Sequence, residues 1–201
     1  MLLTQKTTRL DPRVRRTRQL LLRALQELMA EKSFQAITVR DIAERATVNR
    51  ATFYAHFTDK YALLEFSVRE MFRERLQRLL PEARPFSPGN LATLIQTVCD
   101  FLAEMSGHCP PPHAQYEPLM EKQIKAEVNE ILRNWLAERR LSRSPRAAAP
   151  ELAAVVASWA IYGAAVQWSQ RKRRGPSAEF ARQVLPLVLA NLGAESVRAA
   201  R

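Results

Sequence analysis

The stretch that decides the fold is residues 38–66, TVRDIAERATVNRATFYAHFTDKYALLEF. It opens with Thr38 and Asp41, which have the spacing of a capping box. In that arrangement the Thr38 hydroxyl accepts a hydrogen bond from the Asp41 amide, and the Asp41 carboxylate accepts one from the Thr38 amide. The pattern therefore predicts that a short helix begins here and covers about 39–46.

A second helix start follows almost immediately. Asn49 is a good N-cap and predicts a helix that runs to about His56. Thr47 and Val48 make only a brief break between the two helices, and the small Ala43 stands where their axes must approach. Two short helices joined by a tight turn are typical of a helix-turn-helix unit, whose second helix lies in the major groove of DNA.

This second helix divides into two faces. Phe53 and Phe57 lie one turn apart, which predicts that both belong to the core. On the other face, Arg50 has the donors for a bidentate contact with guanine, and the small Ala51 can touch a thymine methyl group. The remaining polar residues suit contacts with bases or phosphates. The set predicted to face DNA is Arg50, Ala51, Thr52, Tyr54, His56 and, at the start of the next helix, Lys60.

The run Thr-Phe-Tyr-x-His-Phe-x-x-Lys, followed by Leu-Leu, resembles the N-terminal domain of the TetR/AcrR family of bacterial transcriptional regulators over residues 17–66. The resemblance has two departures, because Thr47 and Ala51 stand where that family frequently has glycine. A residue other than glycine at positive φ costs on the order of 1 kcal/mol. The resemblance implies that DNA is faced by Thr38, Arg40, Asn49, Arg50, Thr52, Tyr54, His56 and Lys60.

The charge of the chain also favours a polyanionic partner. Its formal net charge is +11, and its sequence pI is about 10.5. Residues 1–18 contain six basic residues against the single acid Asp11, and they are expected to form a basic arm that grips phosphate. A solvated basic surface without a partner is the alternative that charge alone leaves open.

The rest of the chain is predicted to be helical, because no run alternates apolar and polar residues and only five glycines occur. The fold class is therefore all-α. We expect a DNA-binding domain over 1–62 and a larger ligand-binding and dimerisation domain over 63–201. The expected helices outside the helix-turn-helix unit are 17–31, 60–80, 90–105, 117–140, 151–171 and 177–192, the last bent at Pro186.

The last two helices are expected to pair with those of a second copy, since the resemblance implies a homodimer held by a four-helix bundle. Small residues one turn apart, such as Ala160 and Ala164, would allow helices to approach closely. A buried helix within one chain would show a similar pattern. The predicted interface residues are Val155, Trp159, Tyr162, Gly163, Val166, Leu185 and Leu189.

The resemblance further implies a small-molecule effector held among the middle helices. A lipophilic effector would suit a mostly apolar, aromatic lining, although each residue of this kind is also an ordinary core residue. A chain without such a cavity would instead favour a DNA-architectural or lipid-surface protein. The predicted lining is Met71, Phe101, Met105, Met120, Trp135 and Trp168.

One segment opens a different hypothesis, namely that the protein senses metal or redox state. His108, Cys109 and His113 lie close together in a proline-rich loop, and these side chains can ligate zinc or present a thiol. Residues so close in sequence need not converge, so the main expectation is a loop without metal, and no cofactor.

We expect a cytoplasmic regulator and not an enzyme. The sequence has no phosphate-binding glycine loop, no His-Glu-x-x-His and no Cys-x-x-Cys. Two cysteines do not make a disulfide framework, and the first residues lack the apolar run of a signal peptide. Residues 152–170 carry no charge, but their alanines and serines favour a buried helix over a membrane span.

Overall fold

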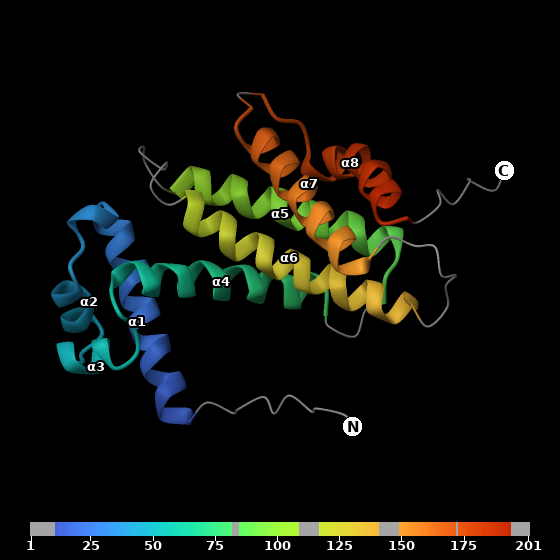
Figure 1. The fold of residues 1–201 in the computed structure, drawn as a ribbon. Coiled ribbons are helices and arrows are strands. Elements are labelled where there is room, and N and C mark those ends of the chain that lie inside the picture. Colours follow the sequence, from blue (N-terminus) through green and yellow to red (C-terminus); the bar gives the residue numbers. More distant parts are fainter. Residues whose placement is uncertain (1–10, 82–84, 109–116, 141–148, 172, 194–201) are drawn as a thin grey trace, which may run out of the picture. The chain divides into compact units, whose positions relative to one another are not determined.

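The computed structural model describes residues 11–81, 85–108, 117–140, 149–171 and 173–193 (Figure 1). The elements in these ranges are helices, with no strand among them, so the all-α prediction is confirmed. The elements are α1 (Pro12–Glu31), the 3₁₀ helix η1 (Phe34–Ala36), α2 (Val39–Arg45), α3 (Arg50–Tyr54), α4 (Lys60–Leu79), α5 (Pro88–His108), α6 (Glu117–Arg140), α7 (Pro150–Ser169) and α8 (Ser177–Asn191).

The chain divides into two compact units, Met1–Ser67 and Val68–Arg201. The division falls within α4, a few residues after the predicted boundary at 62/63. Helix α4 therefore contributes its first turns to one unit and its last turns to the other.

Helix α1 begins earlier than predicted, at Pro12 instead of Thr17. Asp11 is its N-cap, because an Asp11 side-chain oxygen accepts a hydrogen bond from the Arg13 amide at 2.8 Å. Pro12 occupies the first helical position, where its fixed φ suits a helix start and its missing N–H is not needed. The arginines of the expected basic arm from residue 13 onward are thus helical, while residues 1–10 lie outside the described ranges.

The core of the first unit is built around the helix-turn-helix elements. Phe53 is fully buried and Phe57 is 7% exposed, so the prediction that both are core residues is confirmed. The buried stripe of α1 follows Leu21, Ala24, Leu25 and Leu28, and Leu20 beside it is 40% exposed.

The core of the second unit is centred on α5. This helix packs against α7 and α8, and α6 packs against α7 (Figure 1). Phe72, from the last turns of α4, is fully buried, and its ring lies 5.1 Å from that of Phe101 on α5. Fully buried residues of α5 and α6 complete the centre, namely Leu91, Leu94, Ile95, Val98, Ile124 and Leu132.

Helix α7 is apolar on both its buried and its exposed face. By length and composition it is the one helix in the described residues that could cross a membrane, and 44% of its apolar window is buried inside the protein. Ala154, Ala157, Ile161 and Ala165 are fully buried. This inner face belongs to the core, as expected for a buried helix, and the outer face is left uncovered within one chain.

Thr47, in the turn between α2 and α3, has φ 56°, in the left-handed region. A β-branched residue is strained there, as its replacement of the more usual glycine predicted. We expect Thr47→Gly to raise the free energy of unfolding by about 0.5–1 kcal/mol, since glycine removes the steric strain but loses more chain entropy on folding. Urea unfolding measures the difference. Thr58→Gly is the control, because Thr58 is not among the residues at positive φ, and it should give no gain.

Candidate nucleic-acid interface

Helix α2 begins with the predicted capping box. The Asp41 amide donates to the Thr38 hydroxyl at 3.1 Å, and the Thr38 amide donates to an Asp41 carboxylate oxygen at 2.8 Å. That oxygen also lies 2.8 Å from the Lys32 ammonium. The hydrogen bond from Lys32, followed by those from Thr38, lowers the pKa of Asp41 to about 2. The amide and the hydroxyl of Thr38 are thus both used in hydrogen bonds that hold the start of α2.

Helix α3 is positioned by Asn49 and by the turn. The Asn49 side-chain oxygen accepts from the Thr52 amide at 2.7 Å and from the Thr52 hydroxyl at 2.9 Å. The Val48 amide donates to the Ala43 carbonyl at 2.9 Å, which closes the turn over the buried Ala43. Since the Thr52 hydroxyl proton is used by Asn49, this hydroxyl has only its lone pairs to offer to DNA. The helix ends at Tyr54, before the predicted end at His56.

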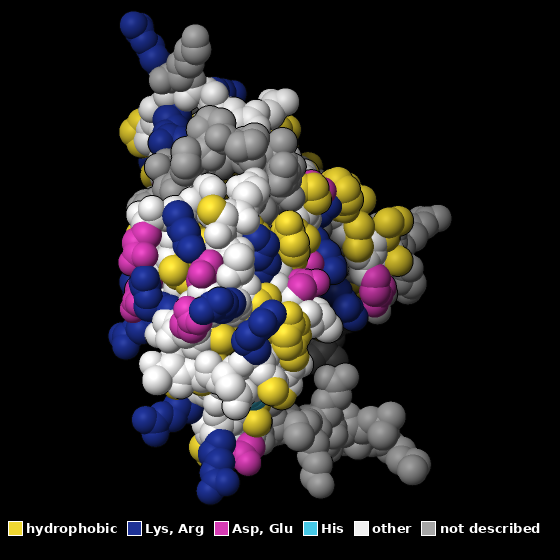
Figure 2. Space-filling view, turned by 90° about the vertical axis from the view of Figure 1, so that its left-hand side faces the viewer, with side chains coloured by type: hydrophobic (Ala, Val, Ile, Leu, Met, Phe, Trp, Pro, Cys, Tyr) yellow, Lys and Arg dark blue, Asp and Glu magenta, His cyan; other side chains and the backbone are white. Residues whose placement is uncertain are grey.

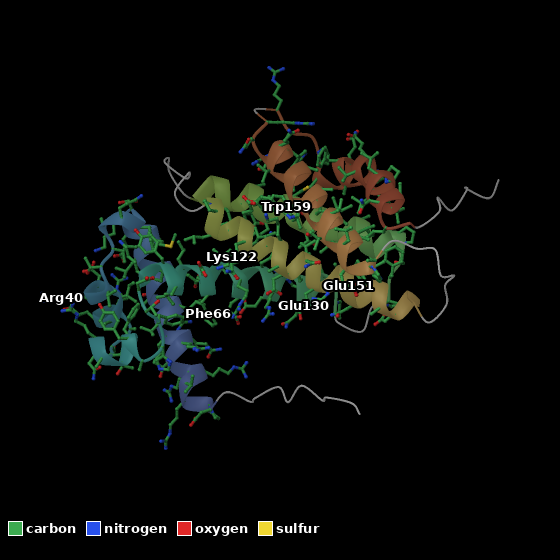
Figure 3. All side chains as sticks on the ribbon, viewed as in Figure 1. Arg40, Phe66, Lys122, Glu130, Glu151 and Trp159 are labelled. Atoms are coloured by element: carbon green, nitrogen blue, oxygen red, sulfur yellow. The ribbon has the colours of Figure 1, made fainter. Side chains whose placement is uncertain are left out.

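The outer face of α3 carries the predicted contact residues. Arg50 and Ala51 are exposed, Tyr54 is 52% exposed, and His56 is half-buried. The side chain of Arg40 projects from α2 (Figure 3) and is 72% exposed, with its Nε 2.7 Å from Glu44. Phe53 lies beneath this face, with its ring edge-on to that of Tyr54 at 5.5 Å. A buried phenylalanine thus anchors a short helix whose other side is open to a ligand.

The geometry of Lys60 differs from the expectation of a free phosphate contact. Its ammonium donates to the backbone carbonyls of Phe34, Gln35 and Ile37 at 3.0, 3.0 and 2.7 Å. It also lies 4.8 Å from the centre of the Phe34 ring. Burial lowers the pKa of Lys60 below its ordinary value. All three N–H donors of the ammonium are used inside the protein, so Lys60 ties η1 to the start of α4.

Part of the predicted basic arm lies on the first turns of α1. Arg13, Arg15 and Arg16 are exposed on the first turns of α1, whose first turn contains no acidic residue. The amino end of a helix carries a partial positive charge, which disfavours nearby cations. The arginines therefore do not stabilise the helix from this position, whereas binding of an external anion would account for their presence there. The Asp-Pro pair at 11–12 was the signal that this segment is helical.

Arg18, one turn further along α1, has a different place. Its guanidinium lies 5.8 Å from the centre of the Phe57 ring and 5.6 Å from that of Phe66. These cation–π contacts join α1, the end of the α3 segment and α4 inside the first unit. Spacing in the sequence gave no reason to separate Arg18 from its basic neighbours.

On the face drawn in Figure 2, positive charge is not concentrated in one block. In Figure 2, Lys and Arg side chains are scattered among Asp and Glu side chains over the face that is drawn. The selective feature of the first unit is therefore the arrangement of α2 and α3, and its general attraction for a polyanion comes from the net charge of +11.

Of the six residues predicted to line an effector pocket, one lines either of the two grooves found among the described residues. Phe101 is 3% exposed and packs on Phe72, and Trp168 is 5% exposed and stacks on Phe180 with 6.1 Å between ring centres. Met71 is 36% exposed. Met105 and Met120 are half-buried and line neither of the two grooves described here. Trp135 is the one of the six that lines either groove. All six were chosen by residue type, which does not indicate the direction in which a side chain points.

The groove that contains Trp135 lies between α4 and α6 and has a volume of about 430 Å³. Its walls are more polar than the predicted apolar pocket. The lining residues are Arg73, Leu76, Gln77, Leu80, Pro81, Glu127, Glu130, Ile131, Asn134, Trp135 and Glu138. A second groove of about 380 Å³ lies between α6 and α7, where the Lys125 ammonium is 2.9 Å from the centre of the Trp159 ring.

The residues predicted at the dimer interface range from exposed to buried within one chain. Val155 and Trp159 are 40% and 57% exposed, and a side chain added at Gly163 would meet nothing within 4 Å. Val166, Leu185 and Leu189 are half-buried. Tyr162 is 8% exposed within one chain, so of the seven predicted interface residues it is the one that is buried. Three exposed residues were missed: Leu152 at 61%, Val156 at 43% and Leu187 at 72%.

The described residues contain no group of three or more His, Cys, Asp or Glu that could hold a metal ion. The predicted loop is not tested by this, since Cys109 and His113, and the side chain of His108, lie outside what the structure describes. Cys99 is buried, and burial raises the pKa of its thiol to about 12, which keeps it protonated and unreactive.

These elements define the class of protein: a helical helix-turn-helix protein with a separate helical unit. A family model described as bacterial regulatory proteins of the tetR family matches residues 21–65. Over 82 residues the chain is 34% identical to the HTH-type transcriptional regulator YxbF of Bacillus subtilis, covering 40% of this chain and 22% of that protein. Over 56 residues it is 43% identical to the class G tetracycline repressor protein of Vibrio anguillarum, covering 28% of this chain and 27% of that protein.

A solved structure supports the fold over most of the chain. FadR of Thermus thermophilus, a TetR-family transcriptional repressor in complex with lauroyl-CoA, is similar with a TM-score of 0.58 and 24% identity, over 91% of this chain and 97% of that chain. Residues 21–65 therefore match the tetR family of bacterial regulatory proteins, and over most of its length the chain shares the fold of the FadR structure. The chain spans only about a quarter of the length of the two curated relatives that it matches.

Proposed function

We propose that the protein is a ligand-responsive repressor that binds operator DNA as a homodimer. The observation that carries this proposal is the two-sided helix α3, with Phe53 fully buried below and Arg50, Ala51 and Tyr54 exposed above. A helix of this kind can enter the major groove because its outer residues are small or able to form hydrogen bonds. The match of residues 21–65 to the tetR family model favours a cytoplasmic regulator and not an enzyme.

In the proposed complex the residues have different tasks. Arg50 and Ala51 contact bases, whereas Arg40, Tyr54, His56 and the α1 arginines contact phosphates and fix the register. Thr38 and Asn49 act chiefly by capping α2 and α3, as their hydrogen bonds support. Two copies of α3 would enter successive major grooves about 34 Å apart on a palindromic operator.

We expect Arg50→Ala to reduce discrimination at one base pair of each half-site by about 1–3 kcal/mol, because the bidentate contact with guanine is lost. Operators are first selected from random DNA with the purified protein, and affinities are then measured for single-base variants. Arg182→Ala is the matched control, since it removes the same charge from an exposed position on α8. Equal losses for every sequence with Arg50→Ala would contradict the assignment of Arg50 to base recognition.

A homodimer is supported by the uncovered face of α7. Leu152, Val155, Val156 and Trp159 recur at helical spacing and are each at least 40% exposed, and Leu187 of α8 is 72% exposed. Apolar residues grouped in this way on a surface mark an interaction site. The face therefore suits pairing of α7 and α8 with their counterparts in a second copy.

Effector control would act through α4, whose first turn holds Lys60 and whose last turns line the groove with α6. A ligand in that groove needs only different affinities for the DNA-binding and released states. Tenfold release corresponds to about 1.4 kcal/mol of differential binding. Control by metal or redox state through His108, Cys109 and His113 is the second candidate; it rests on residue types alone, and zinc titration of the reduced protein tests it.

A further inference from the structure

The groove between α4 and α6 carries a charge opposite to that of the protein as a whole. Glu127, Glu130 and Glu138 line it together with a single cation, Arg73. Arg73 Nε lies 2.7 Å from a Glu127 oxygen, and its second nitrogen lies 3.7 Å from Glu130. Figure 3 shows Glu130 on α6 beside α4. Three carboxylates face one guanidinium, so the groove has an excess of negative charge, although the chain has a net charge of +11.

The same groove has an apolar wall. Leu76, Leu80 and Trp135 are 5%, 7% and 5% exposed, and Ile131 lines the groove beside them. The Trp135 ring is held by Phe86, edge-on at 5.9 Å between ring centres. Apolar walls with a few charged groups are typical of small-molecule sites, and a volume of about 430 Å³ lies within the usual range.

From this combination we propose that the groove takes a small lipophilic cation: an apolar or aromatic body carrying a positive charge. The apolar body would lie against Leu76, Leu80 and Trp135. The positive charge would lie by Glu130 and Glu138, because the one Arg73 guanidinium, which contacts Glu127 and Glu130, cannot balance three carboxylates. Glu127 keeps Arg73 occupied, so the guanidinium is not an anchor for an anion. This proposal rests on the proposed function, since it names the chemical class of the effector.

The charge complementarity argues against an anionic ligand at this place. Lauroyl-CoA, which is bound in the Thermus thermophilus structure, carries phosphates, and these would meet carboxylates in this groove. The two proteins share a fold at 24% identity, and the groove residues of this chain decide its own ligand.

Two probes of nearly the same size and opposite charge test the proposal, namely tetraphenylphosphonium and tetraphenylborate. Calorimetric titration of the full chain should show the cation binding at least tenfold more tightly. The test is demanding, because the net charge of +11 by itself would attract the anion. Equal binding, or tighter binding of the anion, would overturn the proposal.

The double variant Glu130→Gln/Glu138→Gln locates the site. It should weaken binding of tetraphenylphosphonium roughly three- to tenfold, which is the size expected for two exposed ion pairs. Glu74→Gln/Glu151→Gln is the matched control: it removes the same charge from exposed positions outside the groove and should leave the affinity unchanged. Equal weakening by both variants would show general electrostatics and would overturn the proposed site.

A DNA-binding measurement separates this proposal from the proposed function. If tetraphenylphosphonium binds in the groove and also releases the protein from the selected operator, both the ligand class and effector control are supported. Binding in the groove without release supports the ligand class and contradicts effector control through this groove. Release of DNA by other compounds, with no binding of the cation, supports effector control and overturns the ligand class.

Discussion

Lys60→Met should lower the free energy of unfolding by about 2–4 kcal/mol, because three backbone carbonyls lose a charged donor. Methionine keeps most of the apolar stem but cannot donate, so the carbonyls of Gln35 and Ile37 lose the Lys60 donor, while the Phe34 carbonyl keeps only the hydrogen bond from the Ile37 amide at 3.1 Å. For a chain of this size the melting temperature should fall by roughly 5–15 °C. Thermal and urea unfolding of the purified protein measure both quantities.

Lys32→Met is the matched control for Lys60→Met. Lys32 forms one ion pair, with Asp41 at 2.8 Å, and its side chain is 36% exposed, so a loss below about 1 kcal/mol is expected. The salt dependence of DNA binding gives an independent readout. A lysine that contacts phosphate contributes about 0.9 to the slope of log affinity against log salt. A Lys60→Met protein of normal stability with a slope reduced by that amount would contradict the structural role and restore the phosphate contact.

Leu152→Glu/Val156→Glu should convert the proposed dimer into a folded monomer and weaken operator binding at least about a hundredfold. Joining two DNA-binding modules raises the overall affinity by a factor of about 10²–10⁴, and a monomer loses this gain. The two residues are 61% and 43% exposed in one chain, so glutamates there face water and do not disturb the core. In a dimer they would be buried as unpaired charges, which is strongly unfavourable.

Light scattering coupled to gel filtration gives the mass, and fluorescence anisotropy with the selected operator gives the affinity. Leu79→Glu is the matched control, because Leu79 is an exposed apolar residue of α4 at 42% exposure and lies outside the α7 face. It should leave both the mass and the affinity unchanged. A double variant that remains dimeric would contradict pairing through this face of α7.

The local structure of the helix-turn-helix unit was predictable because its signals act over three or four residues. The Thr38–Asp41 capping box and the Asn49 cap are both present, and Thr47 has the positive φ that its place in the turn requires. The burial of Phe53 and Phe57 follows from helical spacing, since one face of α3 must cover the core.

The environments of longer side chains were less predictable. Lys60 and Arg18 both belong to a basic chain that suits a polyanion, yet one caps η1 and the other lies over two phenylalanine rings. The difference depends on residues that are far away in the sequence, such as Phe34 for Lys60 and Phe66 for Arg18. The groove with its carboxylates likewise requires α4 and α6 to lie side by side, about fifty positions apart in the chain.

By itself the sequence determined the helical class, the two capped helices and the family, because caps, turns and apolar periodicity are local and specific. The tertiary structure decided which cations are left for a partner, which apolar residues of α7 remain uncovered, and which charges line the groove. The physical reason is that burial and ion pairing depend on contacts between distant elements, and residue type alone does not distinguish a side chain that the fold uses from one that a ligand can use.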